Sequence, residues 1–312
     1  MDGIINIRDD SGDMAKTKKA PIFIFLLMSV IGTGVMLYPT VSDQINSFRQ
    51  TRAIAAYHTE LTHASREKLQ ALLVEAERYN EQLRSLNGKA AGSDVMHAAY
   101  NKTLRLDVSD VMGYIEIPKI DVYLPIFHGT DQSVLAAGVG HLEGTTLPIG
   151  GENTHSALSG HRGLPTAKLF TNLDKMEIGD MFMVHVLNQT LYYEVENINV
   201  VLPDEVDHLS IEPGKDLVTL ITCTPYGINT HRMLVTGSRV IDMDLPEGAI
   251  PLGAPLQAFD WQHQPVKFPF QSQVILASAA LALVIKIILE LRQKRLKEEY
   301  AQFNKQGVQF LA

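Results

Sequence analysis

Hydrophobic and polar positions divide the chain into two apolar stretches, one near each end, and a mixed segment between them. Residues 20–38 carry no charge and approach the roughly 20 residues that a helix needs to cross a bilayer. A signal peptide has a similar pattern, but no small-residue cleavage site follows promptly. We therefore predict an uncleaved transmembrane anchor over residues 20–41, preceded by a cytoplasmic tail over residues 1–19.

The second apolar stretch covers residues 274–291. Lys286 and Glu290 shorten its uncharged part, although Lys286 lies near one end, where its aliphatic stem can reach the interface. An amphipathic or core helix is the alternative. Basic residues flank both stretches on their outer sides, and the positive-inside rule then places both termini in the cytoplasm. We predict a membrane helix over residues 273–291, a basic cytoplasmic tail over residues 292–312, and an extracellular segment between the two anchors.

Directly after the first anchor, residues 42–86 place apolar side chains at steps of three and four with charges between them, which indicates an amphipathic helix. Such a helix would dock on the following domain or form a stalk. Asn87 and Gly88 end it, since glycine suits the C-terminal turn of a helix. Residues 89–108 show no sustained period and are predicted to form a loop. The whole segment 42–109 is thus a helical stalk followed by a loop.

From Asp110 onward, short runs rich in Val, Ile, Leu and Thr are typical of β-strands. The runs predict two strands broken at Pro118 and Pro125, a strand pair that turns near Asn188, and two more strands, at residues 111–129, 179–203, 216–223 and 231–241. Many short strands and few long helices favour a mainly β barrel or sandwich over residues 110–242. A linker rich in proline and glycine follows over residues 243–272.

Charge and cysteine content narrow the function classes. A formal net charge of −8, without a basic face along the chain, argues against a nucleic-acid partner. A single cysteine excludes an internal disulfide framework and a cysteine-rich zinc site.

That cysteine, Cys223, stands where a predicted strand ends and a turn begins. Free cysteine is usually a small buried hydrophobe, but a thiol becomes a nucleophile where a base or a cation favours its thiolate. If the last two strands pair antiparallel, Arg232 returns beside Cys223, where its cation would stabilise an oxyanion. The alternative is an edge arginine paired with a surface carboxylate.

A base must come from one of 11 histidines. His161 lies between Ser-Gly and Arg-Gly, so its ring is expected in a tight, open loop. His231 is a rival because it stands so near the cysteine. His155, expected in a polar loop, and His185, expected within a strand, are weaker candidates.

The motifs around the histidine, the cysteine and the arginine resemble those of one family, in the family's own order. "TLITC" with Cys223, "SGHRGLP" with His161 and "TCTPYGINTHRMLVTGSRV" with Arg232 are similar to the motifs of sortases, the membrane-anchored cysteine transpeptidases of Gram-positive bacteria. The longer similarity, over about residues 76–240, looks like class C, the pilin-polymerising sortases. It implies a sortase-type eight-stranded β-barrel with peripheral helices, flanked by two transmembrane helices.

The resemblance also implies the chemistry. Cys223 attacks an LPXTG-like sorting signal after its threonine and forms a thioacyl-enzyme. His161 is the acid for the leaving amine and then the base for the incoming amine, Arg232 steadies the oxyanion, and Thr222 lines the site. No metal or organic cofactor is implied. The partners are pilins or surface proteins with LPXTG-like C-terminal signals, and the acceptor is a pilin lysine. A sortase that attaches proteins to cell-wall precursor and a non-catalytic, membrane-tethered β-domain remain as alternatives.

One feature departs from the class C pattern. Class C sortases often carry a lid before the barrel, whose Asp-Pro-aromatic motif plugs the active site. Residues 86–110 contain no such motif, and the nearest substitute is Asp94 with Met96 or Tyr100. We therefore do not expect an autoinhibitory plug of this kind.

Overall fold

The computed structural model describes residues 20–85 and 93–241, and, near the C-terminus, residues 286, 289–290, 292–298 and 300–301. The predicted N-terminal tail, the linker from residue 243 on and most of the second predicted span lie outside the described residues. The chain divides into two compact units, residues 1–37 with 261–312, and residues 38–260. The second unit holds the β-domain.

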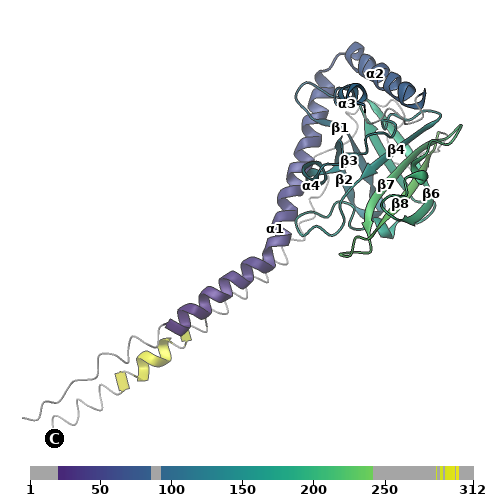
Figure 1. Cartoon of the computed structure of the whole chain (residues 1–312). Coiled ribbons are helices and arrows are strands. Elements are labelled where there is room, and N and C mark those ends of the chain that lie inside the picture. Colours follow the sequence, from purple (N-terminus) through teal and green to yellow (C-terminus); the bar gives the residue numbers. More distant parts are fainter. Residues whose placement is uncertain are drawn as a thin grey trace, which may run out of the picture. The chain divides into compact units, whose positions relative to one another are not determined.

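Eight strands of this unit close into one barrel, in the order β1-β2-β3-β4-β7-β8-β6-β5 (Figure 1). Most neighbours run antiparallel, but β2 pairs with β3, and β4 with β7, in parallel. The prediction of a mainly β, eight-stranded barrel is confirmed. The strands are β1 Val111–Ile117, β2 Val122–His128, β3 Val139–His141, β4 Thr154–Ser159, β5 Met181–Val186, β6 Gln189–Val201, β7 Asp216–Thr224 and β8 His231–Arg239.

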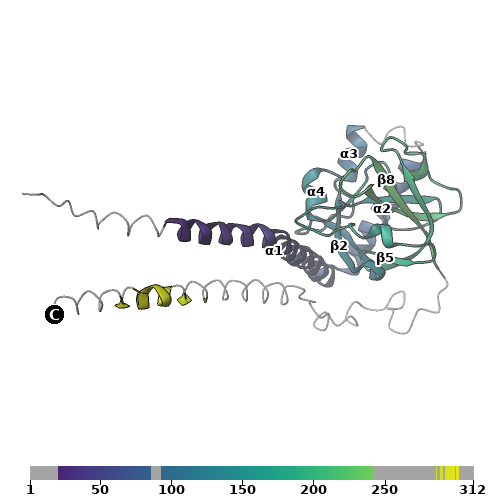
Figure 2. The ribbon, with the colours of Figure 1, turned by 90° about the horizontal axis from the view of Figure 1, so that it is seen from below.

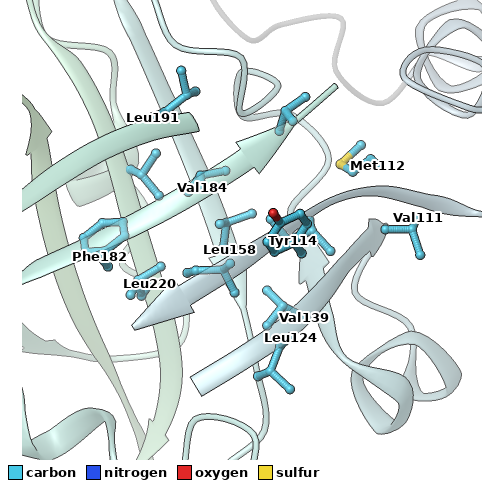
Figure 3. Close-up of a cluster of buried hydrophobic side chains, with 14 of the residues drawn as sticks. Val111, Met112, Tyr114, Leu124, Val139, Leu158, Phe182, Val184, Leu191 and Leu220 are labelled. Atoms are coloured by element: carbon cyan, nitrogen blue, oxygen red, sulfur yellow. The ribbon is translucent and has the colours of Figure 1, made fainter. Parts of the chain in front are cut away.

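The core explains why β7 has apolar residues at both odd and even positions. Side chains alternate between the two faces of a strand. Val218 and Leu220 of β7 pack in the main core, where Figure 3 shows Leu220 near Leu158. Ile221 instead joins a second buried cluster that includes Leu234. A strand buried on both faces needs apolar residues at odd and even positions alike.

The helices are α1 Ala20–His63, α2 Arg66–Ser85, α3 Asp94–Tyr100 and α4 Gln132–Ala137, with three short 3-10 turns at Pro118–Ile120, Leu173–Lys175 and Asp207–Leu209. The C-terminal half of α1 lies along the barrel (Figures 1 and 2), where the hydroxyl of Tyr57 accepts a hydrogen bond from the backbone N–H of Leu187 at 2.7 Å. Among the described residues, no helix combines the length and the apolar character needed to span a membrane.

The helical segment and the loop differ from their predictions. The helical pattern before residue 86 is broken at Ala64 and Ser65, because the hydroxyl of Ser65 accepts a hydrogen bond from the backbone N–H of Lys68 and so starts a new helix. The predicted loop contains α3, which is too short to show a period. Ser93 caps it by accepting from the N–H of Met96.

Two strand predictions also need correction. Pro125 does not break a strand but lies inside β2, opposite Tyr114 of β1. β3 pairs with β2 only from Ile126 onward, so β2 is an edge on that side at Pro125, and edges tolerate proline. His155 lies in β4 rather than in a polar loop, and β3 and β4 were not predicted as strands.

Candidate active site

The parallel pairing of β4 with β7 brings the predicted histidine to the cysteine. Ser159 lies opposite Ile221, and the backbone N–H of Gly160 donates to the carbonyl of Ile221 at 2.9 Å, so the pairing continues beyond the end of β4. Cys223 follows Ile221 by two residues along β7, and His161 follows Ser159, the last residue of β4, by two residues. The register therefore places both residues at the same end of the sheet.

The antiparallel pairing of β7 with β8 adds the arginine. Cys223 lies directly opposite Arg232, and its neighbour Thr224 lies opposite His231. Directly opposed residues project from the same face, and successive residues from opposite faces. Arg232 therefore shares the face of the partly exposed Cys223, whereas His231 is directed to the other face.

The turn between β7 and β8 holds the guanidinium of Arg232. Its Nη1 donates to the carbonyl of Asn229 at 3.2 Å and to that of His231 at 3.1 Å. Asn229 adopts a φ of 63°, a left-handed conformation that asparagine tolerates better than most residues. Because a guanidinium has five N–H donors, this anchoring leaves others to stabilise a negative oxygen.

His161 sits half-buried in a loop that closes on itself. The N–H of Phe170 donates to the carbonyl of His161 at 3.1 Å. A Cβ on Gly160 would lie only 2.6 Å from the Phe170 ring, so glycine is required just before the histidine. Within the described part of the chain, His161 Nε2 is buried without a hydrogen-bond partner. Burial also lowers the pKa of His161 below its usual value, which favours the neutral imidazole.

Comparisons with known proteins agree with this arrangement. A model of the Sortase domain family matches residues 115–240. Sortase D of Bacillus subtilis (strain 168) is 32% identical over 146 residues, which cover 46% of this chain and 71% of that protein. The chain belongs to the sortase family. Sortases are cysteine transpeptidases, and the barrel with its lone cysteine at the end of β7 is the sortase fold.

Solved structures refine the class. Sortase C1 of Streptococcus agalactiae is 47% identical with a TM-score of 0.60, and the match covers 62% of this chain and all (100%) of that one. Sortase C of Clostridium perfringens is 44% identical with a TM-score of 0.55, again covering 62% of this chain and 100% of that one. These two structural relatives of this sortase are class C enzymes.

Thr222 is buried near the end of β7 in this sortase. Its side chain is only 1% exposed, and its hydroxyl donates to the carbonyl of Gly160 at 2.8 Å. Thr222 therefore ties the end of β7 to the residue before His161, and its place in the substrate site stays a prediction.

Arg162 is a residue of the site region that sequence reasoning missed. Its side chain is 8% exposed, and its Nη2 pairs with Asp174 Oδ2 at 2.6 Å. Its Nη1 donates to the hydroxyl of Thr224 at 3.2 Å, and its guanidinium lies 5.9 Å from the ring centre of Tyr226. Arg162 therefore joins the loop of His161 to the residues that follow Cys223. The signal in the sequence was its position directly after the candidate histidine.

The two weaker histidine candidates, His155 and His185, make contacts within the barrel. His155 is buried, and its two ring nitrogens bond to the carbonyl of Ser210 at 2.8 Å and the hydroxyl of Thr219 at 2.7 Å. His185 stacks on Tyr114 with 4.2 Å between ring centres. Both are structural side chains of the barrel wall. Among the described residues, no group of three or more His, Cys, Asp or Glu side chains is placed to hold a metal ion.

Residues 93–108, which precede the barrel, make their contacts with residues other than the cysteine. Met96 and Tyr100 of α3 are buried in the main core, and the Tyr100 hydroxyl lies 3.0 Å from His141 Nδ1. His97 pairs with Glu143 at 2.8 Å. The hydrogen bonds and ion pairs found for residues 93–108 in the described chain do not include Cys223, His161 or Arg232.

Proposed function

We propose that this sortase cleaves an LPXTG-like sorting signal and joins the new carboxyl end to a lysine amine of a pilin, so that it assembles pili. One observation carries the proposal: Cys223 faces Arg232 across β7 and β8, and the β4–β7 register brings His161 to the same end. Two relatives support the substrate class. The C. perfringens sortase C was solved with a C-terminal cell wall sorting motif, and the structure of Streptococcus pneumoniae sortase C concerns pilin substrate specificity.

In the first half of the reaction, the thiolate of Cys223 adds to the carbonyl carbon of the threonine in the signal. The carbonyl oxygen gains negative charge, which the guanidinium of Arg232 stabilises. His161, which has taken the proton of the Cys223 thiol as the thiolate forms, donates that proton to the leaving amine as the C–N bond breaks. The product is a thioacyl-enzyme and a released C-terminal peptide.

In the second half, the lysine amine attacks the thioester carbon. His161, now neutral, accepts the proton of the amine, and the C–S bond breaks to return the thiolate. An isopeptide bond results. Burial lowers the pKa of His161, so the imidazole releases its proton easily in the first step and is available as a base in the second.

We further propose that segments 20–41 and 273–291 anchor the enzyme in the membrane, with both termini cytoplasmic and the barrel outside. Support comes from the uncharged N-terminal run and from basic residues on the outer flanks of both segments. Because Cys223 is the single cysteine, a membrane-impermeant maleimide tests the topology directly. Labelling of intact cells at Cys223 is expected, and labelling only after lysis would contradict the proposed orientation.

The function is tested with the full chain in detergent micelles, an LPXTG-type peptide and two acceptors, a pilin that offers its lysine and an oligoglycine amine. We expect a thioacyl adduct on Cys223, transfer to the pilin, and loss of both in Cys223→Ala. Preference for the oligoglycine acceptor would favour attachment to cell-wall precursor. If no adduct forms with the wild-type chain, the non-catalytic alternative gains support. Retention of transfer by Cys223→Ala would overturn the nucleophile.

A further inference from the structure

The face of α1 that meets the barrel changes from apolar to polar along the helix. Ile54, Tyr57 and Leu61 follow one another at helical spacing and are buried against the barrel. The same stripe, continued toward the N-terminus, passes through Asn46 and Asp43. Hydrophobic packing does not explain why Asn46 and Asp43 are polar. Their hydrogen bonds show which part of the protein this end of the stripe contacts.

Both polar residues bind the backbone of one loop. The side-chain Nδ2 of Asn46 donates to the carbonyl of Thr166 at 2.8 Å. Oδ1 of Asp43 accepts from the backbone N–H of Lys168 at 3.0 Å, and its Oδ2 lies 3.9 Å from Lys168 Nζ. The Asp43 side chain is only 17% exposed. Bonds to backbone groups fix the path of a loop, whereas a bond to a flexible side-chain tip does not.

The loop in question carries His161. Its two ends are fixed from the barrel side, because Thr222 holds Gly160 and the N–H of Phe170 closes on the carbonyl of His161. The middle of the loop, residues 164–168, is held differently. The N–H of Thr171 donates locally to the carbonyl of Lys168. The hydrogen bonds that reach residues 164–168 from other elements, among the described residues, come from Asp43 and Asn46.

We propose that Asp43 and Asn46 are positioning residues for His161, which means that α1 is part of the scaffold of the active site. The proposal rests on the proposed role of His161 as the proton carrier. A displacement of about 1 Å in a catalytic group costs up to about a hundredfold in rate, so a loop released on one side loses activity without losing its fold. The two residues follow the predicted end of the membrane anchor at residue 41 by about 3 and 8 Å of helix.

The test uses the full chain in detergent micelles and five variants: Asn46→Ala, Asn46→Asp, Asp43→Ala, Asp43→Asn and Ser47→Ala. Steady-state cleavage of an LPXTG-type peptide gives kcat and KM from pH 5 to 9, and thermal unfolding gives Tm. We expect Asn46→Ala and Asp43→Ala each to lower kcat about five- to tenfold, the effect of losing one hydrogen bond of ordinary strength. KM should stay within about twofold, and the acid limb of the pH profile should shift, because His161 becomes more hydrated.

Two variants serve as controls. Asp43→Asn keeps an oxygen that accepts from the Lys168 N–H, so it should retain kcat within about twofold. Ser47→Ala changes an exposed residue of the same turn and should behave as wild type. If Asp43→Ala fails to fold, two other variants still test the proposal. Asp43→Asn should retain activity. Asn46→Asp replaces the amide donor by an acceptor and should lose activity.

The inference is overturned if Asn46→Ala and Asn46→Asp lower Tm but leave kcat and the pH profile unchanged, since the contact would then be structural only. Cys223→Ala and His161→Ala are measured in parallel. Retention of cleavage in either of these defeats the proposed function itself. If both lose cleavage while the α1 variants keep it, only the positioning role is wrong.

Discussion

Cys223 of β7 lies directly opposite Arg232 of β8, and the next residue along, Thr224, lies opposite His231. The two cross-strand pairs face opposite sides of the sheet because side chains alternate along a strand. A single hairpin therefore directs Arg232 to the face of the thiol and His231 to the opposite face. Several outcomes can be expected from this arrangement and its surroundings.

Arg232→Ala should lower kcat/KM for peptide cleavage by about 10²- to 10³-fold, the usual cost of losing one group that stabilises an oxyanion. Arg232→Lys should recover only part of this loss. A lysine keeps the charge but lacks the planar guanidinium group, which backbone carbonyls at the turn hold in place. Steady-state kinetics measures both effects.

The matched control for that substitution is His231→Ala, one position earlier on the same strand. Its expected effect on kcat/KM is below about twofold, because the ring lies on the other face, where its Nδ1 is 2.9 Å from the hydroxyl of Thr230. A large loss in His231→Ala together with an active His161→Ala would reverse the assignment of the proton carrier.

Thr222→Val should lower the free energy of unfolding by about 1–3 kcal/mol, because the buried carbonyl of Gly160 loses its hydroxyl donor. The same change should slow peptide cleavage, since Gly160 immediately precedes His161. Thr222→Ser keeps the hydroxyl and should retain the wild-type rate. Equal rates for the Val and Ser variants would show that this bond does not position the histidine. Urea denaturation and steady-state kinetics give the two quantities.

Sequence reasoning succeeded for the part of the site that is local in the chain. Cys223 and Arg232 belong to one hairpin, so strand propensity and the intervening turn were enough to bring them together. The partner of Thr222 is 62 residues away, and the parallel β4–β7 pairing that joins them leaves no short-range signal. His161 was therefore placed beside the cysteine by resemblance rather than by pattern.

The failures have physical causes as well. β4 reads as a polar loop because it contains His155 and two serines, and the ring nitrogens of His155 find their partners only in Ser210 and Thr219, which are distant in sequence. The resemblance implied that Thr222 lines the active site beside Cys223. Alternation along the strand turns its side chain to the face opposite Cys223. Arg162 drew no prediction, since its partners are remote in sequence.

Stability should fall in mild acid partly because of His141. This residue is 0% exposed, and burial lowers its pKa from 6.5 to about 4. Between these two pH values the unfolded chain binds a proton at His141 and the folded chain does not. The contribution of His141 to the free energy of unfolding is therefore present above about pH 6.5 and is lost as the pH falls toward about 4. Between pH 7 and 5 the loss from this one group is about 2 kcal/mol.

Urea denaturation at pH 7 and pH 5 tests this with wild type and His141→Asn. Asparagine does not titrate, so the variant should show a smaller difference between the two pH values, whatever its absolute stability. An unchanged difference would mean that other histidines whose pKa is lowered by burial, such as the half-buried His128, account for the acid sensitivity.

Removal of Asp94 tests whether α3 carries an autoinhibitory plug. In a lidded enzyme, loss of the plugging carboxylate exposes the thiol and speeds its alkylation. Here Met96 and Tyr100, the apolar residues that would accompany such a carboxylate, are buried in the core, and Tyr100 also accepts from the N–H of Gly129 at 2.8 Å. Asp94→Ala should therefore leave the alkylation rate of Cys223 by a small neutral reagent within about twofold of wild type, as should Val95→Ala, a change at an exposed neighbour. A several-fold acceleration confined to Asp94→Ala would show that α3 closes the site after all, through a carboxylate that lacks the usual proline and aromatic neighbours.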